Sequence, residues 1–63
     1  MNRFLCVKTS DGYDLIINVN TIKYIERSPN DKEGSVWIWT DWASSGFVSV
    51  NEPIEDIQKR LGL

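Results

Sequence analysis

The chain has 63 residues and carries seven basic and nine acidic side chains, which give a net charge of −2. At this length we expect one domain spanning residues 1–63. A domain so small buries only about 60% of the surface that its unfolded chain exposes, so a second copy or a partner often stabilises it. The charges form no basic block, which disfavours nucleic acid as a partner. The frequent aromatic and β-branched residues exclude a disordered chain.

Cysteine and histidine usage limits the covalent chemistry. Cys6 is the single cysteine, and there is no histidine. An intramolecular disulfide cannot form, and one thiol among scattered carboxylates is not a zinc site. The apolar run at residues 4–7 is too short for a signal peptide or a membrane span. We expect a cytoplasmic, non-membrane protein without metal or cofactor, in which Cys6 is a small buried hydrophobe.

The first half of the chain predicts three strands. Residues 4–9 form the first, and residues 10–12 form a turn, because Asp-Gly is a strong hairpin signal. Residues 13–19 return antiparallel to the first strand. Residues 20–21 (Asn-Thr) then interrupt the β-branched sequence, since their short side chains bond the local backbone. Residues 22–27 are the third strand.

The second half predicts two more strands and a helix. A polar loop at residues 29–34 leads to a strand at 35–40, and a second loop at 41–46 leads to a strand at 47–50. After this strand the spacing of the apolar residues changes to i, i+3, i+7, at Ile54, Ile57 and Leu61. This spacing places all three on one face of a helix.

Helix-end signals surround this last segment. Asn51 or Glu52 is expected to cap its start, Pro53 belongs to the first turn, and Gly62 ends it. The expected fold class is α+β. We expect a small curved antiparallel sheet of four or five strands, as a meander or partly open barrel, with one C-terminal helix on its apolar face.

Three tryptophans, Trp37, Trp39 and Trp42, lie within six residues of one another. Strand alternation places Trp37 and Trp39 on one face, while their aliphatic neighbours take the other. If the helix covers one face only, the second face needs another subunit or a partner. Three uses are open: packing within the core or between copies, a site for another protein, or a stacking platform for single-stranded nucleic acid or a ligand.

No residue pattern indicates catalysis. Without histidine, the usual general base near neutral pH is absent. The carboxylates Glu52, Glu55 and Asp56 fall at the start of the predicted helix, where the helix dipole favours negative charge, so we interpret them as solvated. We expect no enzyme and no catalytic residue.

Two motifs suggest a relationship. The first is an asparagine-centred turn followed by Ile-x-x-Ile-Glu, here residues 18–26, and the second is Val-x-Glu-x-x-Glu-x-Ile, here residues 50–57. With the order of the elements, over roughly residues 4–61, they resemble the small FlbD-like (swarming motility) proteins of bacteria. The resemblance implies the fold described above and supplies no catalytic residues.

The expected function is a non-enzymatic protein-interaction module of bacterial, phage or mobile-element origin. It is predicted to self-associate as a homo-oligomer or to bind another protein, through a surface formed by Trp37, Trp39, Trp42, Tyr24 and Phe47. The alternative is a small β-barrel that binds single-stranded nucleic acid or a ligand on the three tryptophans.

Overall fold

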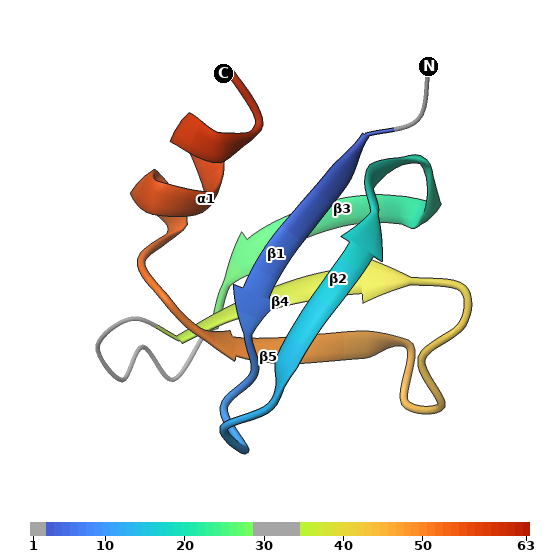
Figure 1. Ribbon diagram of the computed structural model, residues 1–63. Helices are drawn as coiled ribbons and strands as arrows, with labels where there is room; N and C mark the ends of the chain where they lie inside the picture. The colour runs from blue at the N-terminus through green and yellow to red at the C-terminus, as the bar shows by residue number, and fades with distance from the viewer. Residues whose placement is uncertain (1–2, 29–34) are drawn as a thin grey trace.

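The computed structural model describes residues 3–28 and 35–63, so the loop expected at residues 29–34 lies outside the described residues. Its elements confirm the α+β class, with five strands followed by one α-helix (Figure 1). Their bounds are β1 (Phe4–Lys8), β2 (Asp14–Asn18), the short 3₁₀ helix η1 (Val19–Thr21), β3 (Ile22–Arg27), β4 (Ser35–Thr40), β5 (Phe47–Asn51) and α1 (Ile54–Arg60).

The five strands are divided between two antiparallel sheets. One is the β1–β2 hairpin, and the other has the order β3-β4-β5, in which Ile38 lies opposite Ile25 on one side and Val48 on the other. Within residues 3–28 and 35–63, an antiparallel bridge between Thr9 and Val50 links the two sheets, and the amide of Ser10 donates to the carbonyl of Ser49 (2.9 Å) beside it. In the described part of the chain the strands therefore form an open arrangement and not a closed barrel.

Local turn chemistry explains where the strands end. Gly12 has φ +92°, a left-handed conformation that glycine adopts without steric cost, and the amide of Thr9 donates to the carbonyl of Tyr13 (2.8 Å) across the turn. Between β2 and β3, the side chain of Asn18 accepts a hydrogen bond from the amide of Asn20 (3.0 Å). This turn confirms the predicted interruption, and it directs β3 into the second sheet.

The core lies between the two sheets and is closed on one side by α1. In Figure 1 the β1–β2 hairpin crosses over the three-stranded sheet, with α1 beside it. The predicted helix face is confirmed, because Ile57 is buried and its two apolar neighbours on that face pack against the core. The buried aliphatic residues are Leu5, Val7, Ile17, Val36, Ile38, Val50 and Ile57.

The prediction for Cys6 is wrong, because its side chain is exposed. Leu5 and Val7 both point into the core, and successive side chains of a strand point to opposite faces. The residue between two inward-facing positions must therefore point outward. Burial of both neighbours is thus an argument for exposure of Cys6.

The predicted start of the helix is also wrong in its cap. Pro53 occupies the N-cap position, and no side chain caps the helix. Glu52, a predicted cap, instead bonds to β1, as described below. The predicted end is confirmed, since Gly62 adopts φ +78° and its amide donates to the carbonyl of Lys59 (3.0 Å). No helix among the described residues has the length and apolar character needed to cross a membrane.

Candidate interaction surface

The outward face of the three-stranded sheet carries four aromatic side chains. The strand register places Tyr24 of β3, Trp39 of β4 and Phe47 of β5 side by side in one row. Trp37 lies in the next row along β4, between Glu26 and Ser49 of the neighbouring strands. Period-two alternation explains this placement, since Val36 and Ile38 face the core.

These four rings form one continuous group, here called the aromatic face (Tyr24, Trp37, Trp39 and Phe47). Ring centroids are 4.5 Å apart for Trp37 and Phe47, 5.0 Å for Trp39 and Phe47, and 5.4 Å for Tyr24 and Trp39. Trp37 and Trp39 meet edge to face at 6.2 Å. All of these separations lie in the range of favourable aromatic pairs. Tyr24 remains 52% exposed, and the other three are partly buried.

A carboxylate belongs to the same surface. Oε2 of Glu26 accepts a hydrogen bond from the indole Nε1 of Trp39 (2.7 Å). The other side of the Trp39 ring borders Gly46, where a Cβ would lie 3.4 Å from the ring. Sequence reasoning missed Glu26 at this surface. Its spacing of two residues from Tyr24 on one strand was the available signal, because that spacing places both side chains on one face.

Trp42 does not join the aromatic face. Its indole Nε1 donates to Oγ1 of Thr21 (2.9 Å), and the side chain is 49% exposed. None of the ring contacts found in the described residues involves it. The structure therefore brings together four of the five predicted surface residues and places the fifth near η1.

The basic side chains are dispersed and mostly neutralised. Within residues 3–28 and 35–63, four of them form ion pairs with carboxylates, and these pairs are Lys8–Asp14 (3.6 Å), Lys23–Asp41 (3.0 Å), Arg27–Glu55 (3.0 Å) and Arg60–Glu52. No ion pair in this set involves Glu26. The charge carried by the aromatic face is therefore negative.

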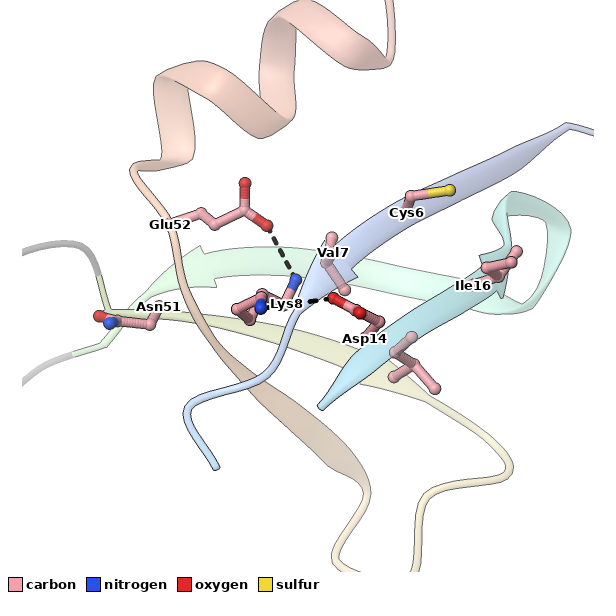
Figure 2. A pocket seen from close by; sticks show the side chains of 8 residues that line it. Cys6, Val7, Lys8, Asp14, Ile16, Asn51 and Glu52 are labelled. Atoms are coloured by element: carbon pink, nitrogen blue, oxygen red, sulfur yellow. Dashed lines mark hydrogen bonds and ion pairs between the residues drawn. The ribbon is translucent and has the colours of Figure 1, made fainter. Parts of the chain in front are cut away.

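The outer edge of β1 is bonded by polar side chains. The amide of Lys8 donates to Oε2 of Glu52 (3.0 Å), and Arg60 donates to the carbonyl of Cys6 (3.1 Å) and to Glu52. Figure 2 shows the carboxylate of Glu52 directed toward β1 beside Lys8. Glu52, just before α1, and Arg60, at its end, thus bond the β1 backbone groups that a neighbouring strand would otherwise bond.

The pocket drawn in Figure 2 is open and lies along the β1–β2 hairpin. Cys6 and Ile16 project from its strands, and the ion pair between Lys8 and Asp14 is part of its wall. Glu52 also lines it, but its carboxylate is occupied by the amide of Lys8 and by Arg60. No group of three or more potential metal ligands occurs in the described residues. The charged groups of the pocket wall thus make contacts within the chain.

Acid should weaken the fold through Glu52. The hydrogen bond from Arg60, together with the amide of Lys8, holds the pKa of Glu52 below its ordinary value, and the same pair raises the pKa of Arg60. In the unfolded chain Glu52 returns to about 4.3. Because the folded pKa is the lower one, this stabilisation is fully present above about pH 4.3 and is lost as pH falls through the folded pKa.

Urea unfolding measured between pH 7 and pH 2 tests this expectation. Glu52→Gln should flatten the acid limb of the stability curve relative to the unaltered chain. Glu55→Gln is the matched control, since Glu55 forms an exposed ion pair with Arg27 and should change the curve little. Equal acid limbs for the unaltered chain and Glu52→Gln would contradict the assignment.

Comparisons of the chain with protein-family models, with curated proteins and with solved structures found no match. Function therefore rests on the geometry of the surfaces described above.

Proposed function

We propose that this chain is a non-enzymatic protein-interaction module that binds through the aromatic face, with a second copy of the chain as its first partner. One observation supports the proposal most strongly: four aromatic side chains, joined by ring contacts into one continuous group, lie on the sheet face opposite the core. The β1–β2 hairpin and α1 both pack on the other face, where Val36 and Ile38 are buried. Aromatic residues on a sheet face that points away from the core are the usual centres of protein interfaces.

Nucleic-acid binding is the less supported alternative. A stacking platform needs rings with free faces beside cations that hold the phosphates. In the aromatic face the rings stack on one another, and Glu26 places a carboxylate among them. The ion pairs of Lys23 and Arg27 further reduce the positive charge of β3. These features favour a protein partner.

The origin of the chain is part of the same proposal. The turn between β2 and β3 and the segment leading into α1 contain the two motifs that resemble FlbD-like proteins. We therefore place the module in a bacterium, a phage or a mobile element, acting in the cytoplasm. The proposal assigns it no catalytic residue, metal or cofactor.

Solution mass across a dilution series tests self-association. The unaltered chain should sediment or scatter as a dimer or larger species at high concentration, and Trp37→Ala should weaken association about 30-fold, as expected for loss of about 2 kcal/mol at an interface centre. Trp42→Ala is the matched control and should leave the mass unchanged, because Trp42 lies apart from the aromatic face.

A monomer at every concentration would rule out self-association through this face. An equal effect of Trp37→Ala and Trp42→Ala would place the contact elsewhere. Quenching of tryptophan emission by oligothymidylate at low salt would favour the stacking alternative instead.

A further inference from the structure

The outer edge of β3 has no strand beside it in the part of the chain that the structure describes. β3 pairs only with β4, whereas β4 lies between β3 and β5. The backbone N–H and C=O groups of an edge strand form a template for one further strand. On β1 the corresponding groups are bonded by Glu52 and Arg60. The edge of β3 is thus available for strand addition.

An apolar groove runs beside this edge, between β3 and α1. It has a volume of about 290 Å³, roughly ten times the ~30 Å³ occupied by a water molecule in the liquid, so it is large enough for an aliphatic side chain. Of the described residues that line it, Gln58 is the single polar one, and Leu63 is 83% exposed at its border. The apolar lining residues are Ile25, Ile54, Ile57, Leu61 and Leu63.

Charged residues often protect an edge strand from pairing, and β3 carries Lys23 and Arg27. Both are neutralised, because Lys23 contacts Asp41 and Arg27 contacts Glu55, each at 3.0 Å. The two flanking cations therefore do not repel a positively charged strand as free cations would.

The remaining charge on β3 is negative. Tyr24 and Glu26 face outward from this strand, where a newly added strand would place its own outward side chains directly beside them. Glu26 accepts a hydrogen bond from the neutral indole of Trp39, and no ion pair among the described residues involves it. Its negative charge is available to a cation on the incoming strand.

We propose that the free edge of β3 binds an extended segment of a partner protein in which apolar side chains alternate with arginine or lysine. The segment adds a strand next to β3, as in other cases of β-strand addition. Its inward side chains enter the groove between β3 and α1, and a basic outward side chain lies against Glu26. The backbone supplies affinity, while the groove and the carboxylate select the sequence.

A second copy of the chain does not supply this strand. Residues directly opposite each other in a sheet share a face, so the cation must come from an outward position. The outward residues of β3 are Tyr24 and Glu26. Those of the other edge strands are Phe47, Ser49 and Asn51 on β5 and Asp14, Ile16 and Asn18 on β2, while the edge of β1 is already bonded by Glu52 and Arg60. None of these outward positions on β2, β3 and β5 carries a cation. This strand site is therefore separate from self-association through the aromatic face.

Titration of the ¹⁵N-labelled chain with a blocked hexapeptide of alternating arginine and valine tests the proposal. We expect chemical-shift changes at the amides of β3, at α1 and at the indole N–H of Trp39, which reports on Glu26. Two control peptides use the unaltered protein. One replaces arginine by glutamate, and the other carries N-methyl groups on the amides along one edge, which prevents strand pairing. Both should lose at least 90% of the binding.

Protein variants complete the test. Glu26→Gln keeps an acceptor for Trp39 but removes the charge, and it should weaken binding of the arginine–valine peptide about tenfold. Asp14→Asn removes a carboxylate from the β1–β2 hairpin and should change affinity less than twofold. Equal binding of either control peptide, unchanged affinity in Glu26→Gln, or shifts confined to β2 would overturn the proposal. So would dilution-dependent shifts of the β3 amides, without peptide, that persist in Trp37→Ala, because this variant weakens association through the aromatic face and the remaining shifts would identify a second copy as the occupant of the edge.

Discussion

Replacing Ile38 with alanine is expected to lower the free energy of unfolding by about 3 kcal/mol. Ile38 is 0% exposed and lies at the centre of β4, between Ile25 and Val48 on the neighbouring strands. Truncation removes buried methyl groups and leaves a cavity, and such changes cost about 2–5 kcal/mol. A chain of this size has a total stability of only about 3–9 kcal/mol at 0.05–0.15 kcal/mol per residue. The variant should therefore melt well over 10 °C lower.

Ile16→Ala is the matched control for this substitution. The same side chain is shortened, but Ile16 is 67% exposed on the outer face of the β1–β2 hairpin. Its loss should change the free energy of unfolding by no more than about 0.5 kcal/mol. Urea denaturation followed by tryptophan emission measures both variants. Similar losses for the two would mean that the core is not centred on β4.

The features that sequence predicted correctly depend on short-range patterns. Alternation along β4 assigned Trp37 and Val36 to opposite faces, and the i, i+3, i+7 spacing in α1 assigned Ile57 to the core. The glycine at position 62 ended the helix because a left-handed residue is required there. Each of these inferences needs only residues within one element or one turn.

The features that sequence did not predict depend on contacts between distant segments. Glu52 bonds to Lys8 across 44 positions, so its role at the edge of β1 has no local signal. The position of Trp42 depends on a hydrogen bond to Thr21, and the division into two sheets depends on how β3 leaves η1. The error on Cys6 was different in kind, because alternation within β1 contained the correct answer.

Replacing Trp39 with alanine is expected to cost about 3 kcal/mol, at the lower end of the range for buried tryptophan because this ring is only partly buried. Trp39 contacts the rings of Tyr24, Trp37 and Phe47. It also donates to the carboxylate of Glu26, and a hydrogen bond to a charged group contributes about 1.5–3 kcal/mol. Loss of the side chain removes all of these interactions at once.

Trp39→Phe separates the two contributions, because it keeps an aromatic ring on β4 but removes the indole N–H. It should cost about 1.5 kcal/mol, while Trp42→Ala, which removes an exposed ring with one hydrogen bond, should cost about 1 kcal/mol or less. Thermal unfolding at a concentration where the solution mass is that of a monomer measures the three variants. If Trp39→Ala costs more than Trp39→Phe, and Trp39→Phe costs more than Trp42→Ala, the aromatic face stabilises the sheet before any partner binds. A partner then meets a preorganised surface. A cost below 1 kcal/mol for Trp39→Ala would instead mean that the rings are held together only weakly in the free chain and are ordered by binding.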